Sequence, residues 1–529
     1  MPFADLKTFY RPDEEIGVVD VPAGTSRIVV RDALGVGLWV PANGSVACEC
    51  LRTGTQAVEA WSSADRLVGE ELTTIGIDPG QRPVMGFATS LGDASIGAVL
   101  DWLRALRCTV VQVYDWMASY TAPLGVGERW SDPLGRGVSR HALLSLAGSL
   151  GSMGAVAQAY APVCASDRTF AAAHPSWRLY RSDGEPERLG DLLDVMDPGF
   201  PDWQHHWLGA YGSACDALGF TGLHLDTYGY PRSPLDADGR SVSMEEAYGA
   251  FLRAVRTGRS GDLLSFNQVN GVPRGMGLPG PPGFRYSEVW MPNDRWRHLE
   301  GVLERSAIGD RSPADTLAIY PPVWGTDREG ALRTVLLTEA IVTMLGATVL
   351  VWGDDHGVLD SAYYPDHERL SPDEVEQVLA WHHFALRCRD LFALGTDTSW
   401  YEIGDENGTV SVSWQGATSP EPIGGAVFAR VVRTDEVITV GVLDLSGSEE
   451  GRWTDPTGAG VCREVEVTVL LDVPGSWAAE AAVLGRRAGR FCLVPAQPAG
   501  HREGSALGFR LPVLAGWSVL RLRRGLERC

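Results

Sequence analysis

The sequence predicts an α/β protein: a central (β/α)8 TIM barrel flanked by an N-terminal and a C-terminal β-sandwich domain. Up to about Arg82, β-rich segments alternate with Gly, Pro and Asn turns. From Pro83 onward, short apolar strands alternate with amphipathic helices, which is typical of a parallel sheet with helical crossovers. After residue 395 strands return without a convincing helix. We therefore expect three domains, at residues 1–82, 83–395 and 396–529.

The first domain is expected to be a small β-sandwich with strands such as Ser26–Asp32 and Val46–Arg52. The barrel strands are then predicted at Val84–Ser90, Thr109–Trp116, Ala155–Pro162, Gly222–Gly229, Leu263–Asn270, Tyr286–Pro292, Thr316–Val323 and Thr348–Asp354. Helices between them are predicted at Ala94–Leu106, His141–Ser152, Met244–Thr257, Trp296–Ser306, Arg333–Leu345 and Pro372–Leu391. A doubly wound open sheet is the alternative, but it seldom supplies eight regular units.

The last domain is predicted to be a second β-sandwich or Greek-key domain, because Gly and Pro turns separate its apolar segments. Its strands are expected at Gly408–Trp414, Ala426–Leu445, Val465–Leu471 and Trp517–Leu522.

The net charge of −22 argues against nucleic acid and against an anionic membrane surface as partners. The chain has no apolar run of about 18 residues and no start that resembles a signal peptide. Its nine cysteines mostly stand singly, as reduced thiols do. We therefore expect a cytoplasmic protein. A neutral sugar would not be repelled by the acidic surface, so an oligosaccharide or polysaccharide partner stays open.

Carboxylates end four of the predicted barrel strands, where the active sites of barrel enzymes lie. These are Asp115 in Tyr114-Asp115-Trp116, Asp226 before Thr227-Tyr228, Glu288 before Val289-Trp290, and Asp354 before Asp355-His356. Glycosidic bond cleavage uses two carboxyl groups, and aromatic rings stack on sugar faces. Asp226 and Glu288, two strands apart, are the candidate pair. The alternative is that such carboxylates only cap helices or pair with arginines.

Four motifs in matching order resemble glycoside hydrolase family 66, the family of endo-dextranases and cycloisomaltooligosaccharide glucanotransferases. The likeness extends over roughly residues 83–395, and the opening Thr8–Glu14 resembles the start of the family's immunoglobulin-like domain. The motifs are Val113-Tyr114-Asp115-Trp116-Met117, Gly219-Phe220-Thr221-Gly222-Leu223-His224-Leu225-Asp226-Thr227, Tyr286-Ser287-Glu288-Val289-Trp290, and Gly353-Asp354-Asp355-His356 followed by Tyr363-Tyr364-Pro365.

The resemblance implies Asp226 as nucleophile and Glu288 as general acid/base of a retaining mechanism. It also implies that Asp115 holds sugar hydroxyls, and that Asp354, His356 and Asn267 belong to the sugar subsite. From their positions beside these residues, Tyr114, Trp116, Tyr228 and Trp290 are further candidates for substrate contacts. Because no His, Cys, Asp or Glu grouping has the spacing of metal ligands, we expect no metal and no other cofactor.

The chain departs from the family pattern at Ala118-Ser119-Tyr120, at Thr221 and at His224-Leu225. These departures leave the catalytic pair in place and affect the choice of substrate. The implied function is a dextranase-like hydrolase of α-1,6-linked glucan, dextran or isomaltooligosaccharides. The connections between strands look too short for the carbohydrate-binding module that the glucanotransferases carry inside the barrel, which favours hydrolysis. The alternatives are a transglycosylase on the same substrates and a non-catalytic carbohydrate-binding barrel.

Overall fold

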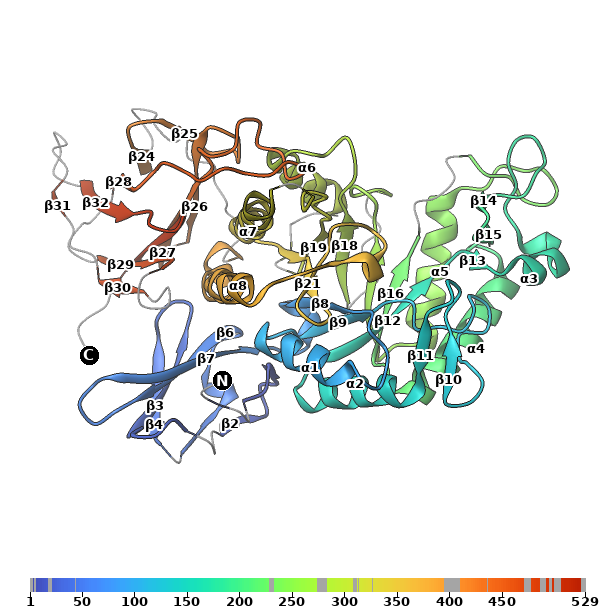
Figure 1. The fold of residues 1–529 in the computed structure, drawn as a ribbon, viewed down its shortest axis with the longest axis horizontal. Helices are drawn as coiled ribbons and strands as arrows, with labels where there is room; N and C mark the ends of the chain where they lie inside the picture. Colours follow the sequence, from blue (N-terminus) through green and yellow to red (C-terminus); the bar gives the residue numbers. More distant parts are fainter. Residues whose placement is uncertain are drawn as a thin grey trace.

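A parallel sheet of eight strands closes on itself at the centre of the molecule (Figure 1). The computed structural model describes residues 3, 6–17, 21–42, 44–227, 233–273, 283–307, 312, 314–325, 327–393, 410–434, 436–470, 477–485, 491–493, 497–498 and 506–524. Neighbouring strands of this sheet are also neighbours along the chain. They are β8 (Met85–Ala88), β9 (Val110–Val113), β12 (Val156–Pro162), β16 (Gly222–Asp226), β17 (Leu263–Asn267), β18 (Gly283–Glu288), β19 (Thr316–Ala318) and β20 (Thr348–Leu350).

The short strand β21 (Trp352–Gly353) closes the barrel. It follows β20 after one residue and pairs in parallel with β8, with Gly353 opposite Phe87. A Cβ atom at residue 353 would lie 2.3 Å from the Phe87 carbonyl oxygen, so only glycine allows this approach. All eight predicted strands are present, and the predicted (β/α)8 barrel is confirmed.

A helix follows every barrel strand except β17, where residues 268–273 contain none. The helices are α1 (Ile96–Ala105), α2 (Arg140–Ser152), α4 (Pro201–Leu218), α5 (Met244–Gly258), α6 (Trp296–Ser306), α7 (Arg328–Met344) and α8 (Pro372–Ala393). In α5, the hydroxyl of Ser243 accepts a hydrogen bond from the Glu246 N–H and caps the first turn. Apolar side chains spaced by three and four residues then bury one face of α5 against the barrel.

Helix α4 is absent from the predicted set. Gly209 and Gly212 and a pair of histidines weaken its helical pattern. Its buried face includes Trp203, Trp207 and Tyr211, which are spaced by four residues and could have revealed it. Before α4, the chain forms the helix α3 (Arg168–Ala173) and a small antiparallel sheet, seen at the right in Figure 1. Its strands are β13 (Ala165–Ser166), β14 (Arg188–Leu189) and β15 (Leu193–Val195).

The N-terminal region is built from a five-stranded sheet in the order β1-β7-β6-β3-β4 and a two-stranded sheet. The five strands are β1 (Phe9–Tyr10), β3 (Arg27–Asp32), β4 (Gly37–Pro41), β6 (Gly54–Trp61) and β7 (Leu67–Ile75), and the pair is β2 (Glu15–Gly17) with β5 (Ser45–Ala47). A separate apolar cluster fills the space between these sheets. The predicted strand Val46–Arg52 is wrong beyond Ala47, because Cys48–Cys50 form a 3-10 turn.

Two further sheets form the C-terminal region, with an apolar cluster of their own between them. The smaller sheet contains β24 (Val410–Ser413), β28 (Glu464–Leu470), β32 (Ala506–Pro512) and β31 (Gln497–Pro498). The larger contains β25 (Ala417–Ser419), β26 (Ala426–Arg433), β27 (Val437–Asp444), β33 (Trp517–Arg524), β29 (Trp477–Val483) and β30 (Cys492–Leu493). The predicted segment Ala426–Leu445 is thus a hairpin of two strands.

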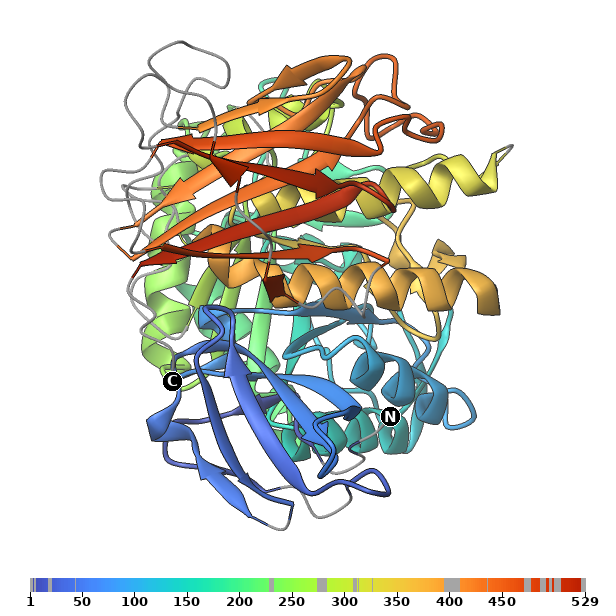
Figure 2. The ribbon, with the colours of Figure 1, turned by 90° about the vertical axis from the view of Figure 1, so that its left-hand side faces the viewer.

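Both β regions lie on the same side of the barrel, as Figures 1 and 2 show. Helix α8 packs against β6 and β7 of the N-terminal sheet, and α7 packs against β27 of the C-terminal sheet. The predicted flanking β-sandwiches are confirmed, while the domain boundaries at residues 82 and 395 stay a prediction. Among the described residues, no helix combines the length and the apolar character needed to cross a membrane.

Candidate active site at the C-terminal ends of the barrel strands

Asp226, Asn267 and Glu288 are the last residues of three adjacent strands, β16, β17 and β18. Because parallel strands end at the same rim of a barrel, the three side chains meet there. Asn267 stands between the two carboxyl groups. Its side-chain nitrogen donates to Oδ1 of Asp226 at 2.8 Å, and its side-chain oxygen accepts the backbone N–H of Glu288 at 3.2 Å. The two contacts together fix the orientation of the amide.

Asp226 is buried, with 6% of its surface exposed. Its second oxygen, Oδ2, accepts a hydrogen bond of 2.7 Å from the hydroxyl of Tyr160 on the neighbouring strand β12. Hydrogen bonds to an ionised carboxylate are the stronger kind, and two of them hold this carboxylate in one rotamer. Both carboxylate oxygens of Asp226 are thus oriented by protein donors before any substrate binds.

His224 lies two residues before Asp226, on the same face of β16. Its partner on the neighbouring strand β12 is Tyr160. Its Nδ1 atom lies 2.8 Å from the Ser265 hydroxyl, which itself donates to Gln158. The Ser265 proton is therefore used, and Nδ1 of His224 must be the donor to it. Burial lowers the pKa of His224 to about 4, although the charge of Asp226 opposes this shift. Asp226 consequently has a neutral imidazole beneath it at neutral pH.

Glu288 is held by two donors of its own. The Tyr320 hydroxyl donates to Oε1 at 2.7 Å, and the indole N–H of Trp290 donates to Oε2 at 3.1 Å. Burial above all, and then the negative charge of Asp226, raise the pKa of Glu288 to about 6. The hydrogen bonds from Tyr320, Trp290 and Asn267 act in the opposite direction. Glu288 therefore carries a proton over part of the neutral range, as a general acid requires.

A cluster of tyrosines surrounds Glu288. The hydroxyls of Tyr320 and Tyr286 lie 3.3 and 2.8 Å from that of Tyr364. Tyr114, a predicted substrate residue, has its ring between those of Tyr364 and Tyr160, with centroids 4.4 Å away on both sides. Neither Tyr160 nor Tyr320 is among the predicted site residues. Tyr160 could have been found, because polar Gln158 and Tyr160 alternate on one face of an otherwise apolar strand.

Asp115 lies at the same rim, and 6% of it is exposed. Its nearest cation is Arg136, with Nη2 at 3.7 Å from Oδ2. Burial raises the pKa of Asp115 to about 7, and the nearby charge of Arg136 only partly offsets it. At 3.7 Å Arg136 is too distant for a hydrogen bond, so the buried carboxyl can still pair with hydroxyl groups of a ligand, and the role of Asp115 in holding sugar hydroxyls stays a prediction.

The two tryptophans of the predicted site differ in exposure. Trp290 has 42% of its surface exposed beside Glu288, so its ring can stack on a sugar. Trp116 is fully buried, with its ring packed on Phe220 and its N–H donated to the Tyr160 carbonyl. The prediction that Trp116 contacts substrate is therefore wrong in this structure, because its ring belongs to the core.

The predicted residues after the last strand also point elsewhere. Asp354 is fully buried, and its two oxygens accept hydrogen bonds from the backbone and hydroxyl groups of Thr89 and Ser90. The ring of His356 packs on Trp102 of α1 at 4.8 Å. The contacts of Asp354 thus lie at the seam between β8 and β21, and those of His356 lie at α1 and at Asp355. Tyr228, another predicted substrate residue, lies outside the described residues.

In the part of the chain that the structure describes, no three His, Cys, Asp or Glu side chains gather in the manner of metal ligands. The residues that could have held a metal at the rim are engaged with protein partners: Asp354 with Thr89 and Ser90, and Asp355 with Arg369 and His356. Activity without a metal or another cofactor stays a prediction.

Comparison with known proteins gives related sequences and folds. Residues 59–520 match the family described as glycosyl hydrolase family 66. Two cycloisomaltooligosaccharide glucanotransferases of Niallia circulans are 25% and 22% identical over 233 residues, which are 40% of this chain and 24% of each relative. The matched segment thus spans about a quarter of the length of these curated relatives.

Among solved structures, a cycloisomaltooligosaccharide glucanotransferase of Paenibacillus sp. complexed with cycloisomaltoheptaose is similar, with a TM-score of 0.78 at 16% identity. The alignment covers 97% of this chain and 98% of that one. A maltogenic α-amylase of Thermotoga neapolitana is more distant, with a TM-score of 0.51 at 11% identity over 84% of this chain and 99% of that one. At such identities the likeness concerns the fold, and it agrees with a barrel flanked by β sheets.

Proposed function

The chain belongs to glycosyl hydrolase family 66, and we propose that it cleaves α-1,6-linked glucans, such as dextran or isomaltooligosaccharides, by double displacement. Family membership bears out the resemblance of the four motifs and supports a glycosidase or transglycosylase. One observation supports the mechanism above all others: Asn267 contacts both Asp226 and Glu288, and the environments of these two carboxyl groups differ.

In the first step, Asp226 attacks the anomeric carbon, and the bond from that carbon to the leaving oxygen breaks. Glu288 gives its proton to the departing oxygen as the bond to Asp226 forms. The Tyr160 and Asn267 donors hold Asp226 for this attack and must loosen as its negative charge moves into the new bond. The raised pKa of Glu288 supports its part as the acid.

In the second step, Glu288 as the carboxylate takes a proton from water, and the resulting hydroxide displaces Asp226 from the sugar. Configuration at the anomeric carbon is retained because two inversions occur. Glu288 is partly exposed and Trp290 beside it is open to solvent, so water can reach the acid/base. This exposure allows water to act as the acceptor in the second step.

Transglycosylation is the second candidate, because the named relatives are glucanotransferases. In that case a sugar hydroxyl replaces water in the second step, and Asp226 and Glu288 keep the same roles. Open access to Glu288 serves either acceptor, so the ratio of the two outcomes depends on how well an acceptor sugar stacks beside Trp290.

The test is product analysis on a panel of α- and β-linked oligosaccharides with the purified protein. We expect cleavage of α-1,6-linked chains, a first-formed product with α configuration by NMR, and mostly shorter reducing sugars. Longer or cyclic products would establish the transferase alternative. Binding of isomaltooligosaccharides without turnover of any substrate would overturn the proposal in favour of a non-catalytic carbohydrate-binding barrel.

A further inference from the structure

The loop that joins β18 to α6, residues 289–295, carries Trp290, and we call it the acid/base loop. Its conformation is fixed by contacts to both sides of Trp290. The backbone N–H of Trp290 donates to the side-chain oxygen of Asn270 at 2.7 Å. The Trp290 carbonyl accepts from the side-chain nitrogen of Asn293 at 3.2 Å. Both backbone groups of Trp290 are therefore held by side chains outside regular secondary structure.

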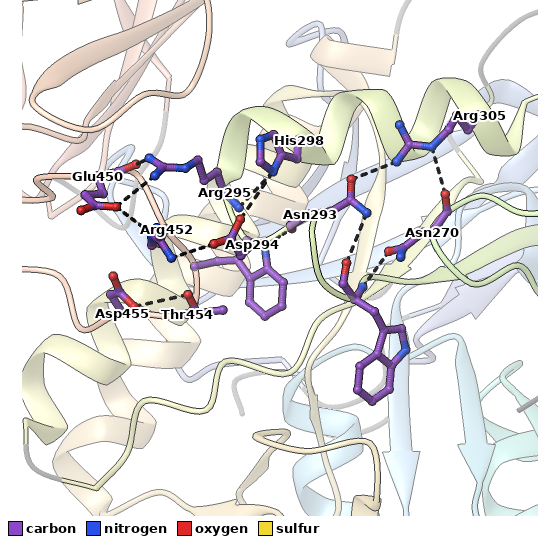
Figure 3. A network of polar contacts seen from close by, with 12 residues as sticks. Asn270, Asn293, Asp294, Arg295, His298, Arg305, Glu450, Arg452, Thr454 and Asp455 are labelled. Atoms are coloured by element: carbon purple, nitrogen blue, oxygen red, sulfur yellow. Dashed lines mark hydrogen bonds and ion pairs between the residues drawn. The ribbon is translucent and has the colours of Figure 1, made fainter. Parts of the chain in front are cut away.

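Arg305 of α6 ties these two asparagines together. Its Nε donates to the Asn270 carbonyl at 3.1 Å, and its Nη2 donates to the side-chain oxygen of Asn293 at 3.0 Å (Figure 3). The guanidinium uses two donors of a rigid fork, so it fixes the spacing between the asparagines as well as their orientation.

The other side of the acid/base loop is held by the C-terminal region through residues 450–453, which we call the clamp segment. The indole N–H of Trp453 donates to the Asn293 carbonyl at 2.7 Å, and the Trp453 backbone N–H donates to the carbonyl of Asp294 at 3.2 Å. Arg452 donates to Oδ2 of Asp294 at 2.8 Å. Figure 3 shows Asp294, Arg295, Glu450 and Arg452 converging at this junction.

We propose that the clamp segment is a positioning element for the acid/base: it holds the acid/base loop so that the Trp290 indole donates to Glu288. This inference rests on the proposed function of Glu288. Trp290 itself is half-exposed and its ring lies at a tilt 5.9 Å from that of Tyr320, whereas Trp453 is 4% exposed and belongs to the main core. The rigid anchor of the exposed indole is thus the C-terminal region, more than 150 residues later in the sequence.

The clamp segment affects proton donation through the position of Trp290 relative to Glu288. A catalytic group must be held within about 0.5 Å of its productive position, and supporting hydrogen bonds supply that precision. If the clamp loosens, the loop can shift while the fold stays intact, and the 3.1 Å contact between Trp290 and Glu288 lengthens. Proton donation by Glu288 then becomes slower. The attack by Asp226 does not change, because Tyr160 and Asn267 hold that carboxylate.

The test uses Trp453→Phe, which keeps an aromatic ring at the buried position and removes the N–H to Asn293. We expect kcat/KM on an isomaltooligosaccharide to fall about tenfold, the size of one hydrogen bond in an orienting network. On isomaltosyl fluoride, whose leaving group needs little protonation, we expect a change of less than about twofold. The matched control is Trp517→Phe, another buried tryptophan of the C-terminal region, whose indole N–H has no hydrogen-bond partner among the described residues.

A double-mutant cycle separates positioning from general damage. If the clamp acts through Trp290, then Trp290→Phe and the double variant Trp290→Phe/Trp453→Phe should have the same kcat/KM within about twofold. Additive losses, or equal losses on both substrates, would overturn the proposal. Should Trp453→Phe prove unstable, Arg452→Met breaks the contact to Asp294 at a more exposed position and should give the same substrate split, with a smaller loss.

A readout without catalysis keeps this inference distinct from the proposed function. In protein labelled with 5-fluorotryptophan, the 19F signal of Trp290, assigned by Trp290→Phe, should shift or broaden in Trp453→Phe and stay in place in Trp517→Phe. An unmoved Trp290 signal in Trp453→Phe would overturn the clamp. Absence of turnover in the wild type, with the signal shifting as expected, would instead overturn the function proposed for Glu288.

Discussion

Asn267 donates a hydrogen bond of 2.8 Å from its side-chain nitrogen to Oδ1 of Asp226. Asn267 is fully buried, ends the strand between the two carboxyl-bearing strands, and also accepts the backbone N–H of Glu288. One amide therefore sets the position of the proposed nucleophile relative to the strand that carries the proposed acid/base. A neutral side chain is required there, because a third carboxylate would repel the two others at close range.

The first prediction concerns this position. Asn267→Asp keeps the shape of the side chain, removes the donor to Asp226 and adds a negative charge beside it. We expect kcat/KM to fall at least about 100-fold, since a hydrogen bond to a charged group is lost and repulsion is added. Steady-state kinetics on isomaltooligosaccharides would measure this. A variant with normal activity would show that Asn267 does not orient Asp226.

The second prediction is a pH shift. Glu288 must be protonated to act as the acid, so kcat/KM should fall as the pH rises through its pKa of about 6. The hydroxyl of Tyr320 donates to the ionised form and lowers that pKa. Tyr320→Phe should therefore move the alkaline limb of the profile to higher pH. Tyr211→Phe is the control, because that buried hydroxyl contacts the Met117 sulfur, away from Glu288. A limb that moves to lower pH in Tyr320→Phe would contradict the assignment.

The third prediction concerns stability. Burial raises the pKa of Asp115 to about 7, whereas an aspartate in the unfolded chain titrates near about 3.9. The unfolded state therefore loses this proton first, and stability is lost as the pH rises from about 4 through about 7. Asp115→Asn should increase the free energy of unfolding by about 1–3 kcal/mol at pH 8 and change it little at pH 4.

Asp132→Asn is the matched control for this measurement. The carboxylate of Asp132 is also buried, but it accepts hydrogen bonds from the Leu134 and Arg136 backbone and from the Arg136 side chain. Its neutralisation should destabilise the protein at pH 8. Urea denaturation at the two pH values measures both variants. If Asp115→Asn also destabilises the protein at pH 8, the interactions of the ionised Asp115 carboxylate outweigh the cost of burying it, and the prediction is wrong.

The ends of three barrel strands could be predicted because the sequence changes from apolar to polar where β16, β17 and β18 stop. That boundary identifies Asp226, Asn267 and Glu288, and parallel pairing brings adjacent strand ends together. Tyr320 was harder to identify, because it stands two residues beyond the end of β19 and only the closed barrel turns its hydroxyl toward Glu288. The clamp segment could not be predicted, since nothing local in residues 450–453 indicates contact with the barrel.

Two of the predicted rim residues that contact other parts of the protein, Asp354 and His356, share an unusual backbone conformation. Asp115, Asn270, Asp354 and His356 all have positive φ angles between 47° and 58°. Non-glycine residues rarely adopt this conformation, and it reverses the direction in which a side chain leaves the strand. His356 consequently packs on Trp102, and Asp354 turns into the seam at Thr89. The assumption that residues after a strand face the substrate fails at Asp354 and His356, whereas Asp115, with the same backbone conformation, stays at the rim.

The fourth prediction identifies the nucleophile. Asp226→Ala should abolish turnover on every substrate, including glycosyl fluorides, because no other carboxylate can form the covalent intermediate. We expect a loss of at least about 10⁴-fold in kcat. Circular dichroism and binding of isomaltooligosaccharides should remain close to those of the wild type. Full activity in this variant would refute the double displacement.

The last prediction separates the acid/base from the nucleophile. Glu288→Ala should lose most activity on isomaltooligosaccharides, whose leaving oxygen needs a proton, and should keep the first step on aryl or fluoride glycosides. The second step then lacks a base, so the glycosyl-enzyme should accumulate and give a burst. Azide, an anion that needs no deprotonation, should restore turnover, and the glycosyl azide should have the configuration of the substrate because Asp226 has already inverted it once. NMR of the azide product reports the face of attack. An azide of inverted configuration would mean direct displacement, with Asp226 present but not acting as a nucleophile.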